Sequence, residues 1–318
     1  MIWFKLIFKQ NQPIHIGSVE WGVINETEIF IPGWTMWGAL TNQFLKTIGF
    51  RKIESAKKFF KKITNFYPVI GNEEEVNFNP LFPGYNKGDF YLGDYPEGKF
   101  KFEFVDTLVS TAIEPLLRSA KDESLHEFEY ILPKSKLDLD NRSKQLYWVG
   151  LIGFEEEVIK DINSLITNGN NDQDIKENDK NDESKKNEDK DYNDFLLDVF
   201  SKVYIGGDIK YGFGKLELLN LSIDVTEEEL SEWNITGNGT ASIKPNFPLK
   251  QFFKFSNEIK FEGELKLLSE FDFTQNIPKV QEAGYFINVG SKVSDFNGID
   301  LSKYHLTKGK FEKNKIIE

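Results

Sequence analysis

The residues that are best suited to bind a ligand lie in a glycine-rich stretch from Ile205 to Leu218. Four glycines, Gly206, Gly207, Gly212 and Gly214, fall within nine positions of it. Because glycine has no Cβ, successive backbone N–H groups can come close to a ligand there, as phosphate binding requires. The side chains between and after these glycines add positive charge and one aromatic ring: Lys210, Tyr211 and Lys215.

Two common nucleotide-binding motifs fail on detail in this stretch. Gly207 and Gly212 have the separation found in a P-loop, but Phe213 stands where the lysine is needed and no Ser or Thr follows. A G-x-G-x-x-G dinucleotide motif is also missing. The stretch therefore predicts either a phosphate or RNA cradle or a tightly packed turn, and we expect no cofactor.

Histidine and acidic residues near the N-terminus offer a second kind of chemistry. His15 is either an RNA contact or general base, or a histidine hydrogen-bonded beside the end of a strand. The other histidines, His126 and His305, are too distant in sequence to suggest a metal cluster, so no metal site is expected. Glutamates at three nearby positions could act as a base or metal ligands in RNA cleavage: Glu20, Glu26 and Glu28.

Aromatic residues open an expected helix over Trp34–Ile48, where helix N–H groups favour a phosphate and indoles can stack on bases. Trp37 fits core packing best, whereas Trp34 fits either the core or a base. Seven basic residues cluster near the end of this helix and after it. They form either a surface that follows a nucleic-acid backbone or a solvated helix face: Lys46, Arg51, Lys52, Lys57, Lys58, Lys61 and Lys62.

Composition describes a folded chain with an acidic balance. Its 318 residues carry a formal net charge of -12, and 39% of them are hydrophobic. The absence of cysteine excludes disulfides, thiolate metal sites and cysteine nucleophiles, and favours the cytoplasm. The N-terminus alternates apolar and charged residues, unlike a signal peptide, and no apolar run is long enough for a membrane helix. Residues 168–194 are almost entirely Asn, Asp, Glu and Lys, which predicts a disordered insert serving as a solvated loop or an interaction tail.

Hydrophobic periodicity supplies the elements that must position these residues. We expect strands at 2–9, 100–110, 128–132, 146–154 and 215–223, helices at 34–48, 53–66, 155–166 and 195–203, loops at 71–98, and short strands after 226. The order β, α, β, β, α, β over residues 2–223 predicts an α+β, ferredoxin-like unit with insertions. The expected domains are 1–225, which contains the acidic insert, and a β-rich extension at 226–318 that is separate or part of the same domain.

Three motifs resemble the RAMP (repeat-associated mysterious protein) superfamily of type III CRISPR systems. Gly206-Gly207 with Gly212-Phe213-Gly214 is similar to its glycine-rich loop, which lies before the last strand of the core unit. Residues 12–18 (QPIHIGS) followed by 31–40 (IPGWTMWGAL) are similar to its first strand, turn and helix entrance. Residues 136–149 resemble the segment before the second half of its fold.

The resemblance implies a structural subunit that assembles along CRISPR RNA with other effector subunits and meets target RNA. The RNA-binding residues it implies are His15, Gly17, Ser18, Trp34, Thr35, Gly206, Gly207, Lys210, Tyr211, Gly212, Gly214 and Lys215. Some members cleave target RNA with an aspartate before the Ile-Pro-Gly element, but residues 17–31 hold no aspartate, so a non-catalytic role is expected. An endoribonuclease and a protein-interaction subunit without RNA contact stay open as alternatives.

Overall fold

The structure is a computed structural model, and it describes residues 1–50, 52–71, 77–136, 143–170, 192–222, 225–272 and 277–313. Most of the predicted acidic insert, residues 171–191, lies outside the described residues, as do 137–142 of the third motif. None of the described helices is long and apolar enough to cross a membrane.

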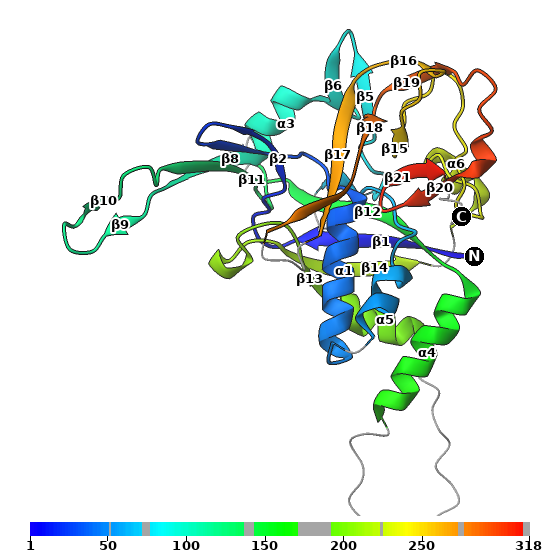
Figure 1. Cartoon of the computed structure of the whole chain (residues 1–318), viewed down its shortest axis with the longest axis horizontal. Helices are drawn as coiled ribbons and strands as arrows, with labels where there is room; N and C mark the ends of the chain where they lie inside the picture. The colour runs from blue at the N-terminus through cyan, green and yellow to red at the C-terminus, as the bar shows by residue number, and fades with distance from the viewer. Residues whose placement is uncertain are drawn as a thin grey trace, which may run out of the picture.

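A five-stranded sheet forms the centre of the molecule (Figure 1). Its strand order is β13 (Lys202–Tyr204), β14 (Lys215–Ser222), β1 (Ile2–Gln10), β12 (Gln145–Phe154) and β4 (Tyr67–Gly71), and neighbouring strands are antiparallel. All ten residues of β12 are buried, because both faces of the sheet are covered. The strands predicted at 2–9, 146–154 and 215–223 are confirmed.

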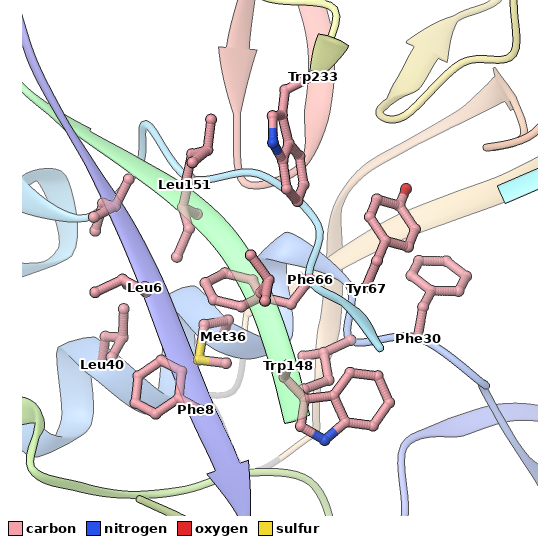
Figure 2. Packing of buried hydrophobic residues seen from close by; sticks show 14 of the residues in the cluster. Leu6, Phe8, Phe30, Met36, Leu40, Phe66, Tyr67, Trp148, Leu151 and Trp233 are labelled. Carbon is pink, nitrogen blue, oxygen red and sulfur yellow. The ribbon is translucent and has the colours of Figure 1, made fainter. Parts of the chain in front are cut away.

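Helices cover one face of this sheet: α1 (Gly33–Thr47), α2 (Ile53–Phe59), α4 (Glu156–Asn170) and α5 (Tyr192–Phe200). Figure 2 shows Met36 and Leu40 of α1 beside Leu6 and Phe8 of β1. These apolar side chains recur at helical and strand spacing respectively, so their burial drives the two elements together. The predicted helix at 34–48 is confirmed, and α4 and α5 confirm the helices on either side of the insert. The prediction of a helix as far as Val203 is wrong at its end, because β13 begins at Lys202.

Between residues 53 and 71 one prediction is wrong and one strand was missed. The second helix ends at Phe59 instead of Phe66, and the chain then runs extended, with bridges from Ile63 to Ile152 and from Phe66 to Ile31. The following strand β4 at the sheet edge was missed. The local apolar spacing favours a helix, but this segment pairs with strands of the sheet instead. Those strands come from residues distant in sequence, so the local pattern does not reveal the pairing.

A second region carries a projecting β-arm. Its sheet has the order β2 (Gly17–Trp21), β3 (Ile24–Thr27), β11 (His126–Ile131) and β8 (Val105–Ser110), and β9 (Ile113–Glu114) and β10 (Ser119–Ala120) continue it outward. In Figure 1 this arm extends away from the body of the molecule. The strand predicted at 128–132 is confirmed as β11.

The strand predicted at 100–110 is wrong in its first half. Residues Glu97–Phe104 form α3, which buries Phe100, Glu103 and Phe104 on one helical face, and only Val105–Ser110 is the strand β8. The stretch expected to be loops also holds a small sheet of β5 (Pro83–Asn86), β6 (Asp89–Leu92) and β7 (Tyr95–Pro96).

The C-terminal residues form α6 (Glu227–Glu232) and a second five-stranded sheet. The order of this sheet is β17 (Leu265–Asp272), β18 (Lys279–Ile287), β15 (Phe252–Lys254), β21 (Lys310–Lys313) and β20 (Tyr304–Thr307), and β16 (Lys260–Glu262) pairs with β19 (Lys292–Asp295) beside it. Short strands were expected here, whereas α6 was not. The ring of Trp233 lies 5.8 Å from that of Tyr67, so one hydrophobic core joins the C-terminal residues to the central sheet.

Candidate nucleic-acid interface

The glycine-rich stretch is the loop of a hairpin. Strands β13 and β14 are antiparallel, with Tyr204 opposite Lys215, and residues 205–214 connect them through the 3-10 turn η1 (Ile209–Tyr211). The loop closes on itself where the N–H of Ile205 donates to the carbonyl of Gly214 at 3.0 Å. The structure thus places the motif at one end of the central sheet.

Backbone hydrogen bonds attach this loop to the segment that follows β1. The N–H of Gly214 donates to the carbonyl of Pro13 at 2.7 Å, and the N–H of Gly207 donates to the carbonyl of His15 at 3.0 Å. The carbonyl of Lys215 accepts from the N–H of Asn11 at 3.0 Å. Two motifs about 190 residues apart in sequence therefore form one surface.

Two of the glycines are required by geometry. Gly206 has φ +74°, and a Cβ there would lie 2.1 Å from the carbonyl oxygen of His15. Gly214 has φ +91°, and its Cβ would lie 2.3 Å from the carbonyl oxygen of Ile205. Both distances are far below a van der Waals contact, so only glycine fits at these two positions. This agrees with the interpretation of the motif as a tightly packed turn.

The tip of the loop is open to solvent. Tyr211 is 82% exposed, and Lys210 is exposed beside it. Phe213 anchors the other side, with its ring 5.7 Å from Phe128 and 5.4 Å from Tyr130 on β11. A rigid base thus presents an ammonium group and an aromatic ring, the combination that contacts phosphates and stacks on bases in single-stranded nucleic acid.

His15 is clamped beside the end of β1. Its Nδ1 lies 2.6 Å from the carbonyl of Glu129, and because a carbonyl only accepts, Nδ1 carries the proton. The ring meets Phe128 edge-on at 5.3 Å. This geometry matches the structural interpretation of His15.

A buried glutamine network sets the position of this segment. Gln10 donates from Nε2 to the carbonyl of Ile131 at 2.8 Å and accepts from the indole N–H of Trp148 at 3.0 Å. Gln145 in turn donates to the carbonyl of Gln10 at 2.7 Å. The sequence analysis gave no site role to Gln10, Gln145 or Phe213. The available signal for the two glutamines was their position at the ends of two largely apolar strands.

Trp34 and Thr35 lie elsewhere. The ring of Trp34 is 5.2 Å from that of Phe252 in β15, and the N–H of Thr35 donates to the carbonyl of Pro32 at 3.0 Å. The first N–H of the helix, on Gly33, donates to the side chain of Asn65 at 2.8 Å. The helix entrance therefore packs against the C-terminal region, and the structure does not bring these two residues to the glycine-rich loop.

Two of the three acidic residues considered for RNA cleavage, Glu26 and Glu28, are engaged in ion pairs, and the side chain of Glu20 lies outside the described part of the structure. Glu26 lies 3.5 Å from the ammonium of Lys101, and Glu28 pairs with Lys266 of β17. Glu28 also accepts a hydrogen bond from Ser18 at 2.9 Å. These contacts connect the β2–β3 hairpin to α3 and to the C-terminal sheet. In the described part of the chain, no group of three or more His, Asp or Glu side chains could hold a metal ion.

No protein-family model and no curated protein match the chain. Solved structures do match: a chain of the type III-B Cmr-beta complex bound to cognate target RNA and AMPPnP aligns with TM-score 0.50 and 14% sequence identity, over 91% of this chain and 85% of that one. A chain of the Csm3-Csm4 subcomplex of the type III-A CRISPR-Cas interference complex covers 98% of each chain, with TM-score 0.44 and 11% identity. The chain therefore shares its fold with a chain of the type III-B Cmr-beta complex, and the predicted resemblance is confirmed at the level of the fold.

Proposed function

We propose that this chain is a non-catalytic subunit of a type III-like CRISPR effector complex that binds CRISPR RNA in the cytoplasm, for antiviral defence. The observation that carries the proposal is the attachment of the glycine-rich loop to the segment around His15 by two backbone hydrogen bonds. The resemblance implies that the glycine-rich loop lies near RNA, and the sequence analysis separately considered His15 as an RNA contact. Their meeting on one surface is what a shared RNA site requires.

The strand order supports the ferredoxin-like part of the proposal. A unit of the order β, α, β, β, α, β that folds with strand order 4-1-3-2 matches β14, β1, β12 and β4, with α1 and the α4–α5 segment as its two helices. We treat β13 as an addition to one edge of that unit. Residues 226–318 then form an extension that shares the core of the first 225 residues, as the contact of Trp34 with Phe252 supports.

The contacts of the individual residues divide the RNA site into two parts. Gly206, Gly207 and Gly214 shape the loop, while Lys210 and Tyr211 at its tip make the RNA contacts, joined by the exposed backbone around Gly17. Trp34 and Thr35 support the helix entrance and do not contact RNA. The engagement of Glu26 and Glu28 in ion pairs supports the absence of RNA cleavage.

The β-arm supports assembly with other subunits. Leu116 is 90% exposed and Leu117 is 76% exposed at its outer end, and Ile113 is exposed beside them. Apolar side chains grouped on a projecting hairpin favour burial against a partner. Target RNA that pairs with the CRISPR RNA is an expected further partner of the assembly.

The test is co-purification of tagged chain with its effector subunits and a CRISPR array, followed by sequencing of the bound RNA. A double variant at the loop tip, Lys210→Ala with Tyr211→Ala, is expected to lower recovered repeat-derived RNA about tenfold, since it removes one phosphate contact and one stacking contact. The matched control is Lys202→Ala with Tyr204→Ala, the same residue types on exposed positions at the base of the same hairpin.

Three outcomes contradict the proposal. Recovery of effector proteins without RNA favours the protein-interaction subunit. Cleavage of labelled repeat or target RNA by the purified chain, with or without Mg²⁺, favours the endoribonuclease. Equal RNA loss in the tip variant and its control removes the loop tip as the contact.

A further inference from the structure

A cavity of about 530 Å³ lies between the residues after α2 and the C-terminal sheet. Three lysines line it, Lys61 from the segment after α2, Lys254 from β15 and Lys313 from β21. The hydroxyl-bearing residue Thr307 of β20 lies at the same cavity. None of residues 205–214 is among the lining residues, so this cavity is distinct from the glycine-rich loop.

Two of the neighbouring carboxylates, Glu270 and Glu312, are paired with other lysines, and a third, Glu282, also lines the cavity. Glu270 accepts from Lys308 at 3.1 Å and from Lys310 at 2.9 Å, and Glu312 lies 3.4 Å from Lys310. Within the described ranges, Lys61, Lys254 and Lys313 have no ion-pair partner. The cavity is therefore lined by three ammonium groups that make no ion pair with a described residue, and by the carboxylates of Glu282 and Glu312.

Aromatic rings hold two of these ammonium groups in place. The Nζ of Lys254 lies 4.7 Å from the ring centre of Phe286, and that of Lys313 lies 5.4 Å from the ring centre of Tyr304. A ring face attracts an ammonium group electrostatically without neutralising it, so its charge stays available to a ligand. Gly284 makes room for Lys254, because a Cβ at this glycine would lie 2.1 Å from the lysine Nζ.

The ammonium group of Lys61 lies in the field of the neighbouring lysine Lys308. Its carbonyl accepts from the N–H of Lys308 at 2.8 Å, which places the two residues side by side. Burial, followed by repulsion from Lys308, lowers the pKa of Lys61. A bound anion would relieve this repulsion and raise the pKa of Lys61 again.

We propose that this cavity binds a phosphate ester of nucleotide size, whose oxygens accept from the ammonium groups of Lys61, Lys254 and Lys313. A monoanion such as a carboxylate would leave most of these charges uncompensated, whereas a phosphate ester carries several anionic oxygens. The cavity volume is within the usual range of small-molecule sites. The proposal is independent of the RNA site on the glycine-rich loop.

The experiment is calorimetric titration of the full chain with adenosine monophosphate, with inorganic phosphate and with sulfate as a charge control. Adenosine monophosphate is expected to bind more tightly than sulfate, and Lys254→Met and Lys313→Met are each expected to weaken it by about tenfold, the loss of one charge-assisted hydrogen bond. Lys303→Met is the matched control, because Lys303 is an exposed lysine in the same region, ion-paired with Asp300. Circular dichroism confirms that each variant is folded.

Two further variants test the geometry. Gly284→Ala should displace Lys254 and weaken adenosine monophosphate binding without removing any charge. Glu282→Gln, which removes a carboxylate at the cavity, should tighten binding about twofold by reducing repulsion. If the Gly284 variant does not fold, Lys313→Met decides the question alone.

Two sources of the phosphate are distinguished by a second arm, in which short RNA with a 5′-phosphate or a 5′-hydroxyl competes with adenosine monophosphate. Competition only by the phosphorylated strand assigns the cavity to an RNA end, and no competition by either assigns it to a free nucleotide. The proposal is overturned if adenosine monophosphate binds no more tightly than sulfate, or if the lysine variants behave as Lys303→Met does.

Discussion

The glycine-rich loop and the lysine-lined cavity both present positive charge, but different parts of the chain shape them. Main-chain hydrogen bonds and two glycine conformations shape the loop, whose ammonium group at Lys210 is simply exposed. Side-chain ion pairs around Glu270 and cation–π contacts shape the cavity. A backbone-shaped site leaves a sequence motif because only glycine fits it, whereas a side-chain-shaped site uses common residues that leave no motif.

The largest effect is expected from a substitution in the glycine-rich loop, the site that the backbone shapes. Gly206→Val places a branched side chain against the carbonyl of His15 at a positive φ, and we expect it to lower the free energy of unfolding by about 2–4 kcal/mol. Urea denaturation measures the change. The control is Gly212→Ala, also at a positive φ (+89°) but with no atom within 4 Å of the added Cβ, which should cost about 1 kcal/mol. Equal losses in the two variants would contradict the role of close packing at Gly206.

The second effect is expected from a substitution in the ion pairs beside the lysine-lined cavity. Glu270→Gln leaves Lys308 and the buried Lys310 without their shared carboxylate, and we expect a loss of about 1–2 kcal/mol at pH 7, reduced from the value for a buried pair by solvent exposure. Hydrogen bonds and charge interactions with these lysines outweigh burial and lower the pKa of Glu270 to about 2.

The same carboxylate predicts a pH dependence. A depressed native pKa contributes stability that is present above the ordinary value of 4.5 and is lost as the pH falls toward 2. The difference between wild type and Glu270→Gln should therefore shrink between pH 4.5 and 2 in urea titrations. Glu54→Gln, which changes an exposed carboxylate, should leave the unfolding midpoint nearly unchanged. A constant difference across this range would contradict the assignment.

The smallest expected effect is an increase in the free energy of unfolding, and it concerns Lys250, a lysine outside the cavity. The backbone of Lys250 is held by Asn234, Asn65 and Tyr67, while its ammonium lies 4.9 Å from the ring centre of Phe82. Burial lowers the pKa of Lys250 to about 8. Because the unfolded chain binds this proton more tightly, wild-type stability should rise between pH 8 and 10.5.

Lys250→Met should remove that rise and increase the free energy of unfolding near pH 7 by about 1 kcal/mol. Thermal unfolding at pH 7 and pH 10 measures both changes. Lys244→Met is the control and should change neither, because Lys244 is an exposed lysine that lines one pocket together with Lys250 and Phe82. Destabilisation by Lys250→Met at pH 7 would show that the contact with Phe82 outweighs the cost of burying the charge.

The sequence predicted the elements whose own pattern matches their surroundings. β1 and β12 are rich in β-branched and aromatic residues and lie at the centre of the sheet, and the apolar side of α1 faces that sheet. It failed for α3, whose residues alternate like a strand but bury Phe100 and Phe104 on one helical face. It also failed for β4, where five residues form a strand only because β12 offers an edge.

The candidate RNA site follows the same division. Gly206, Gly212 and Gly214 were identifiable from sequence because their spacing marks backbone that other residues cannot adopt. Trp34 was ambiguous because an indole packs equally well on a base or in a core, and the side chain that meets it, Phe252, lies more than 200 residues away.

By itself the sequence determined the α+β composition, the glycine-rich loop and the lack of cysteine chemistry, since each depends on residue type and local spacing. The tertiary structure alone decided which charges are paired. Glu28 meets Lys266, and Glu270 takes Lys308 and Lys310 away from the cavity that Lys61 and Lys313 line. Electrostatic interactions act through space over a few ångströms, so their partners are set by the packing of the sheets and not by the distance along the chain.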